Sequence, residues 1–117
     1  MSTLTITARD AATGPVIEIT GDLDHDTAPE LRKAVDGLTV AGGHLLLLDL
    51  AGLRFCDSSG ISALLSARSL AIEQGGHIAL AAVPANTARI LGIVGLDQVF
   101  TIHADAATAT APSSAAR

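Results

Sequence analysis

Two serines and an aspartate stand where a run of apolar residues gives way to an amphipathic segment. The run "LLLLDLAGL" ends at Leu53, and "DSSG" follows shortly as Asp57, Ser58, Ser59 and Gly60. Aspartate and serine before a helix are common capping residues, because their oxygens accept hydrogen bonds from amides that have no helical partner. The same amides and the helix dipole stabilise anionic oxygens, so a serine here is also a good place for a phosphate. The four residues therefore allow two interpretations, a helix cap and a modification site.

A second acidic group lies in the segment "GDLDHDT", between an expected strand and an expected helix. It contributes Asp22, Asp24 and Asp26, which a solvated turn would also contain. The segment lacks the glycine and the distal glutamate of a calcium-binding loop, so we expect no metal site there. Loops that follow parallel strands gather at the carboxyl edge of an α/β sheet. We therefore expect Asp22, Asp24 and Ser58 to share one surface.

Three residues have the types of a hydrolytic triad, but their order in the chain argues against one. Ser58, His25 and Asp57 would be nucleophile, base and acid, yet Asp57 is the direct neighbour of Ser58, and no G-x-S-x-G elbow is present. In a triad the acid lies behind the histidine. Cys56 is a poor nucleophile, because a neighbouring carboxylate raises the pKa of a thiol. We expect no catalytic residue and no enzymatic activity.

The composition narrows the class of protein and its compartment. The chain has 117 residues, enough for one domain, and a formal net charge of -5 with Lys33 as its single lysine. Without a basic cluster it is a poor match for the backbone of a nucleic acid. The lone Cys56 fits a reducing compartment, and we see neither a signal peptide nor an apolar run of about 20 residues. We expect a cytoplasmic protein that binds neither nucleic acid nor a membrane.

Strands and helices alternate along most of the chain. Short alternating or fully apolar runs predict strands, and apolar stripes at three- and four-residue spacing predict helices. The expected strands are 4–10, 16–20, 44–50, 77–83 and 98–103, and helices are expected after Thr27, Asp57 and Pro84. Thr27 and Glu30 match a capping box at the start of the first helix.

This order of elements predicts an α/β fold. Strands that alternate with helices pair in parallel through helical crossovers, while the short turn after the first strand predicts an antiparallel hairpin. We expect a mixed, mostly parallel sheet of four or five strands, with the segment 44–50 in its centre because it is apolar on both faces. Residues 1–103 would form the one domain. Residues 104–117 are small and polar without periodicity, which predicts a disordered tail.

Two motifs together resemble the STAS domain, and specifically the anti-sigma factor antagonist family. The first is "ITGDLDHDTA" at 19–28, and the second is "LDLAGLRFCDSSGISALL" at 48–65. The resemblance extends over residues 4–103 and includes "VPANTARILGIVGL" at 83–96 as the third helix region. It implies a STAS-type fold and a partner-binding protein without a cofactor. Asp22 stands where this family more often has glutamate, which is a mild departure.

The resemblance also implies a phosphorylation switch at Ser58. In this family the matching serine is phosphorylated by a partner that is both an anti-sigma factor and a serine kinase, and a metal-dependent serine phosphatase resets it. The unmodified protein binds the anti-sigma factor, so that the sigma factor is released, whereas the phosphorylated protein does not bind. By the same resemblance, the partner-binding residues are Asp22, Asp24, Asp57, Ser58, Ser59 and Gly60.

Other classes of binding protein match parts of the sequence. A STAS subunit of a transport or signalling complex would share the fold and bind its partner without a phospho-switch. Such domains often lack a phosphorylatable serine, which argues against this alternative because Ser58 and Ser59 are present. A nucleotide-binding domain is less favoured, since the chain has neither a P-loop nor a G-x-G-x-x-G motif.

Overall fold

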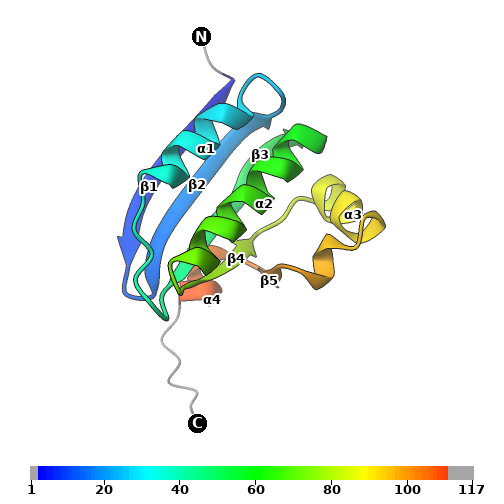
Figure 1. Cartoon of the computed structure of the whole chain (residues 1–117). Coiled ribbons are helices and arrows are strands. Elements are labelled where there is room, and N and C mark those ends of the chain that lie inside the picture. Colours follow the sequence, from blue (N-terminus) through cyan, green and yellow to red (C-terminus); the bar gives the residue numbers. More distant parts are fainter. Residues whose placement is uncertain (1–2, 111–117) are drawn as a thin grey trace.

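The computed structural model describes residues 3–110, which form one mixed sheet with helices packed on it (Figure 1). The strands are β1 (Leu4–Ala11), β2 (Gly14–Leu23), β3 (Leu45–Cys56), β4 (His77–Ala81) and β5 (Thr101–His103). They lie in the order β1-β2-β3-β4-β5. β1 and β2 form an antiparallel hairpin, and the other neighbouring strands pair in parallel. The predicted α/β sheet with its apolar strand in the centre is confirmed.

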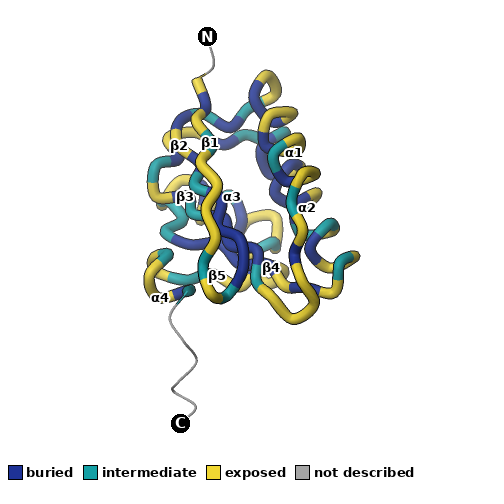
Figure 2. The backbone as a smooth tube through the Cα atoms, turned by 90° about the vertical axis from the view of Figure 1, so that its left-hand side faces the viewer, coloured by how far each residue is buried: buried dark blue, intermediate teal, exposed yellow. Residues whose placement is uncertain are grey.

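Helices follow β2, β3 and β4, and a fourth follows β5. They are α1 (Ala28–Asp36), α2 (Ser58–Glu73), α3 (Ala85–Ile93) and the short α4 (Ala106–Thr110), with a 3₁₀ turn, η1, at Leu96–Gln98. α1 and α2 pack against each other on one face of the sheet, and Figure 2 shows α4 on the opposite side. α3 lies beside the first turns of α2 (Figure 1). Because η1 takes up the start of the predicted last strand, β5 is shorter than expected.

The central strand β3 is apolar on both sides because both faces of the sheet are covered. Leu46, Leu48 and Leu50 are fully buried in the core that includes the apolar residues of α1 and α2. Leu47 belongs to a separate cluster with Val16 and residues of α4. Successive side chains of a strand point to opposite faces. One strand therefore contributes to two apolar layers.

β2 and β3 continue beyond the apolar runs that predicted them. Their pairing extends to Leu23 and Cys56, with a shift of register after Gly21. Gly21 has a φ of 107°, and a Cβ there would lie 2.0 Å from the Thr3 carbonyl oxygen. Only glycine fits this bend, because other residues disfavour positive φ and would also clash. As a result of the longer β3, Asp57 alone separates the strand from α2.

The start of α1 differs from the predicted capping box. Thr27 immediately precedes the helix, but its side chain makes no capping hydrogen bond. The Thr27 hydroxyl oxygen instead accepts a hydrogen bond from Asp24 N at 2.8 Å and lies 2.8 Å from the Asp22 carbonyl oxygen, to which it can donate. The buried Thr27 side chain thus holds together the loop that leads from β2 to α1.

Residues 106–110, expected in a disordered tail, form α4 instead. Ala109 is buried in a cluster with Leu47 and Ala81 on the outer face of the sheet. This packing covers apolar surface of β3 and β4 that would otherwise face solvent, which is the physical reason for the helix. The rest of the predicted tail, residues 111–117, lies outside the described residues.

We expect Ala109→Asp to lower the free energy of unfolding by about 1–3 kcal/mol, because it places a charge against buried aliphatic side chains. Ala107→Asp is the matched control, since Ala107 is exposed in the same helix and its substitution should change stability by less than about 0.5 kcal/mol. Urea unfolding measures both variants. Equal stability of the two would mean that α4 is not held on the sheet.

Candidate functional site

The ends of β2 and β3 bring the two acidic segments to one edge of the sheet. Leu23 pairs with Cys56 at the end of the ladder, and the Asp57 amide donates a hydrogen bond to the Leu23 carbonyl oxygen at 3.3 Å. The residues that follow these strand ends are therefore neighbours in space, as the sequence predicted. The name acidic edge is used below for Asp22, Asp24, Asp57 and Ser58.

The carboxylates of the acidic edge are only partly neutralised. Arg54 Nε lies 3.6 Å from Asp22 Oδ1, and the arginine side chain is 70% exposed, so this is a weak surface pair. Within residues 3–110, neither Asp24 nor Asp57 has a cationic side chain within salt-bridge distance. The edge therefore favours an incoming group with positive charge.

Asp57 caps α2, so the hydroxyl of Ser58 is not needed for that purpose. Asp57 has an extended backbone, and its Oδ1 accepts a hydrogen bond from Gly60 N at 3.0 Å. Ser58 is the first residue of the helix and is exposed. A phosphate on Ser58 would lie where the first amides and the dipole of a helix stabilise negative charge. Among residues 3–110, the Asp57 carboxylate accepts a hydrogen bond from the Gly60 amide and makes no hydrogen bond to His25, which the acid of a triad would make.

Asp24 belongs to the architecture of its loop as well as to the acidic edge. Its Oδ1 accepts hydrogen bonds from Asp26 N at 3.0 Å and from Thr27 N at 3.1 Å. The Thr27 hydroxyl is also within hydrogen-bond distance of this oxygen, at 3.1 Å. Removing the carboxylate would disturb the loop and the local charge together. An Asp24→Ala variant would therefore not isolate a role in binding.

Gly60 sets how closely α2 approaches the strand ends. It is buried, and a Cβ at this position would lie 2.6 Å from both the Leu23 carbonyl oxygen and Cys56 Sγ. Gly60 therefore positions the start of the helix and offers little surface of its own, while its role in partner binding stays a prediction. Ser59 beside it is partly exposed, so a contact there is compatible with the structure.

Cys56 is buried under the start of α2 and is a weak nucleophile. Burial raises the pKa of its thiol to about 11, and the Asp57 carboxylate adds to the increase. The thiol is consequently protonated at neutral pH. The increase in the thiol pKa has the direction that the sequence predicted from the neighbouring Asp57. The larger cause of the increase is burial, which depends on the packing of α2.

The raised pKa of Cys56 predicts a loss of stability in alkaline solution. The thiol has a pKa of about 11 in the folded chain against 9.0 for an unperturbed thiol. Above the lower value the unfolded chain loses this proton while the folded chain keeps it, so the free energy of unfolding falls by about 1.4 kcal/mol per pH unit until the folded thiol also ionises. We expect Cys56→Ala to lack this component when urea unfolding is followed from about pH 8 to 10.5. If the free energy of unfolding fell equally with rising pH in the wild type and in Cys56→Ala, the raised pKa of the Cys56 thiol would be contradicted.

An apolar hollow of about 360 Å³ opens beside Ser58, between α2 and the α3–η1 segment. Its lining consists of the apolar residues Ile61, Ile90, Val94 and Leu96 and the polar residues Asp57, Ser58 and Ser62. Its lining residues lie in the segments 48–65 and 83–96 that carry the family resemblance, but the sequence does not show that these segments meet. The run "ILGIV" at 90–94 is the one available signal, since it is more apolar than an exposed helix end requires.

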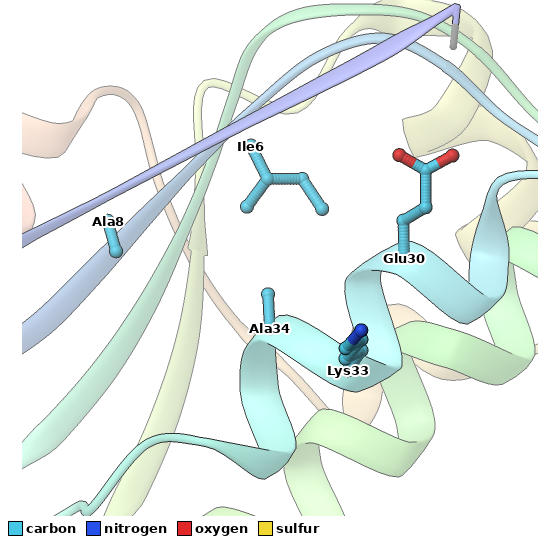
Figure 3. A pocket seen from close by; sticks show the side chains of 5 residues that line it. All are labelled: Ile6, Ala8, Glu30, Lys33 and Ala34. Carbon is cyan, nitrogen blue, oxygen red and sulfur yellow. The ribbon is translucent and has the colours of Figure 1, made fainter. Parts of the chain in front are cut away.

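A second hollow, of about 480 Å³, lies between β1 and α1. Figure 3 shows the residues that line it, which are Ile6, Ala8, Glu30, Lys33 and Ala34. None of them belongs to the acidic edge. Its two charged side chains have opposite sign and lie three positions apart on one helix, an arrangement typical of a solvated helix face. We assign no site to this hollow.

The structure also bears on metal sites and on membrane-spanning helices. Within residues 3–110, no three or more His, Cys, Asp or Glu side chains are grouped so that they could hold a metal ion. In the same part of the chain, no helix has the length and apolar character needed to cross a bilayer. The aspartates of the segment 22–26 accordingly do not converge as metal ligands.

Sequence comparison finds one family model and several curated relatives. The model described as "Mlab, STAS domain" matches residues 6–102. An anti-sigma F factor antagonist of Paenibacillus polymyxa is 29% identical over 89 residues, covering 75% of this chain and 76% of the relative. The anti-sigma-F factor antagonist RsfB of Mycobacterium tuberculosis is 31% identical over 99 residues, covering 85% of this chain and 80% of the relative.

Solved structures share the fold. An anti-sigma factor antagonist from Mycobacterium paratuberculosis has a TM-score of 0.79 at 24% identity and covers 92% of this chain and 93% of its own. The antagonist SpoIIAA matches with TM-scores of 0.68 unphosphorylated (21% identity, coverage 90% and 92%) and 0.65 phosphorylated (20% identity, coverage 90% and 96%). A sulfate transporter family protein from Wolinella succinogenes matches at 0.70 with 17% identity, covering 81% of this chain and 80% of its own. The fold alone therefore does not distinguish an anti-sigma factor antagonist from a protein of the sulfate transporter family.

Proposed function

This chain belongs to the STAS domain family, and we propose that it is an anti-sigma factor antagonist controlled by phosphorylation of Ser58. The observation that carries the proposal is that Ser58 is the exposed first residue of α2, in a helix start already capped by Asp57. The unmodified chain binds an anti-sigma factor and thereby frees a sigma factor. It acts as a binding protein and not as an enzyme. Because sigma factors work inside the bacterial cell, this exchange takes place in the cytoplasm.

The partners that fit this function are an anti-sigma factor with serine kinase activity and a metal-dependent serine phosphatase. The curated relatives, named as antagonists of anti-sigma factors, support the first of these partners. A kinase and a phosphatase must both reach the serine oxygen, and the exposure of Ser58 allows this. The carboxylates of the acidic edge favour basic residues on the partner at the contact.

A phosphate on Ser58 would act on the interface and leave the fold intact. It adds about -1.5 to -2 charges beside Asp57, at a helix start that tolerates negative charge. The likeness of this chain to SpoIIAA in both the unphosphorylated and the phosphorylated form supports a switch without refolding. The added charge would instead repel the phosphates of a nucleotide bound in the kinase and block close contact.

A second candidate function is that of a STAS subunit in a transport or signalling complex without a phospho-switch. The likeness to a sulfate transporter family protein favours it, but at 17% identity this likeness concerns the fold alone. The two serines at the start of α2 and the 31% identity to a curated antagonist favour the switch. We therefore rank the antagonist function first.

The test is to incubate the chain with purified anti-sigma factor kinases of the same organism and ATP, and to map the product by mass spectrometry. We expect one phosphate on Ser58 in the wild type, none on Ser58→Ala and normal phosphorylation of Ser59→Ala. A phosphate on Ser59 would mean that Ser59, and not Ser58, matches the phosphorylated serine of the family motif. The proposed switch mechanism would then still stand. If none of these kinases binds or modifies the chain, the transport-complex alternative becomes the better one.

A further inference from the structure

We infer that the hollow beside Ser58 receives an apolar side chain of the anti-sigma factor, with a basic residue of the same partner on the acidic edge next to it. This inference rests on the proposed function and specifies how the partner is held. It concerns apolar residues of α2, α3 and η1 to which the sequence analysis assigned no role in binding.

The hollow has the chemistry of a pocket for an aliphatic or aromatic side chain. Ile61 forms a buried part of its lining, with 8% exposure, while Ile90 and Leu96 are partly buried around it. Val94 stands at its border with 55% of its surface exposed. Burying a hydrocarbon group here would remove these side chains from water, and such pockets hold the anchor residues that dominate many interfaces.

Exposed apolar surface continues beyond the hollow. Six large apolar side chains are exposed among the described residues, and three of them, Ile93, Val94 and Val99, lie in the segment from the end of α3 to the start of β5, with exposures of 76%, 55% and 39%. Single exposed apolar residues are ordinary on a protein surface. Val94 lines the hollow, and Ile93 is its direct neighbour in the chain, so exposed apolar surface adjoins the hollow, as on a surface that a protein partner covers.

The charge around the hollow decides between a different protein and a second copy of this chain. Asp57 lines the hollow itself, and it belongs to the acidic edge with Asp22 and Asp24. In a symmetric dimer the same patch lies on both subunits, so a second copy docked here would bring two acidic edges together. Like charges opposed across an interface cost several kcal/mol. A partner that presents a basic residue beside its apolar side chain avoids this cost.

The position of Ser58 on the lining of the hollow links this pocket to the switch. Ser58, Asp57 and Ser62 are its polar residues, while the deeper lining is apolar. A partner side chain that fills the hollow would exclude water from the Ser58 hydroxyl. A neutral hydroxyl tolerates this, but a phosphate would lose its hydration beside hydrocarbon, which is strongly unfavourable. The pocket therefore makes partner affinity sensitive to a single phosphate.

The experiment measures affinity for the purified kinase that phosphorylates the wild-type chain, by calorimetry with ADP present. Val94→Ser removes apolar lining, and Ser62→Tyr places a ring at the hollow. We expect affinity to fall about five- to fiftyfold for each variant, as for truncated anchor contacts. Ile72→Ser and Ser66→Tyr are the matched controls, because these exposed residues lie on α2 outside the hollow, and they should stay within about twofold of the wild type. Melting temperatures verify that all four variants fold.

The outcomes separate this inference from the proposed function. If Val94→Ser and Ser62→Tyr bind like the wild type while phosphorylation of Ser58 still blocks binding, the pocket is wrong and the function stands. If no anti-sigma factor kinase binds the wild-type chain, the function and the pocket fail together. If sedimentation shows that the chain is a dimer that Val94→Ser dissociates, the occupant is a second copy and the inference is overturned. Equal losses in the variants and their controls overturn it as well.

Discussion

Phosphorylation of Ser58 is expected to lower the affinity for the anti-sigma factor by at least about a hundredfold. The phosphate would face the like-charged phosphates of the nucleotide bound in the kinase, and like charges at an interface cost several kcal/mol, where each tenfold loss of affinity corresponds to about 1.4 kcal/mol. The phosphate would stand beside Asp57, on an edge where Arg54 is paired with Asp22 and provides little compensation. Calorimetry of the phosphorylated and unmodified chains, with ADP or ATP present, measures the difference. Equal affinities would exclude a phospho-switch at this position.

Two substitutions at Ser58 separate the loss of the phosphorylation site from the effect of an added negative charge on binding. Ser58→Ala cannot be phosphorylated and should bind constitutively, with a stability change of less than about 0.5 kcal/mol, because Asp57 and not Ser58 caps α2. Ser58→Asp supplies one charge where a phosphate supplies about -1.5 to -2, so it should weaken binding only in part. A Ser58→Ala variant that unfolds more easily by about 1 kcal/mol would show that the serine also acts as a cap.

The fold was predictable because the sequence pattern and the sheet topology agree. The run at 44–50 is apolar at every position but Asp49 and His44, and the structure uses its alternate side chains on two covered faces. Strand ends and helix starts follow from local chemistry, such as the aspartate that caps α2. The meeting of the two acidic segments followed from the rule that parallel strands end at one edge.

Features that depend on contacts between distant segments were not predictable. Thr27 matched a capping box by type and spacing, yet its hydroxyl bonds to the preceding loop, because that loop folds back on it. α4 consists mainly of alanine, which has no apolar periodicity, and forms where an apolar sheet face needs a cover. The hollow beside Ser58 exists only because α3 and η1 return to the start of α2.

Gly60→Ala is expected to destabilise the protein by about 2–3 kcal/mol, although alanine is the better helix former. The added methyl group would lie 2.6 Å from the Leu23 carbonyl oxygen and from Cys56 Sγ. The carbonyl belongs to the backbone of β2 and the thiol is buried, so neither gives way without moving α2. The start of the helix must shift instead, and Ser58 moves with it. We therefore also expect slower phosphorylation of the folded variant.

Gly92→Ala is the matched control for this prediction, because it places the same methyl group on a helix without a clash. Gly92 is exposed in α3, and a Cβ there would have Asp97 Oδ2 at 3.8 Å as its neighbour. Alanine should stabilise this helix by about 0.5–1 kcal/mol through its lower entropy cost. Urea unfolding of the two variants thus gives changes of opposite sign if the close approach of α2 to β2 and β3 is real. A stabilising effect of Gly60→Ala would mean that the helix can withdraw from the strand ends at no cost, and the rigid placement of Ser58 would then have to be abandoned.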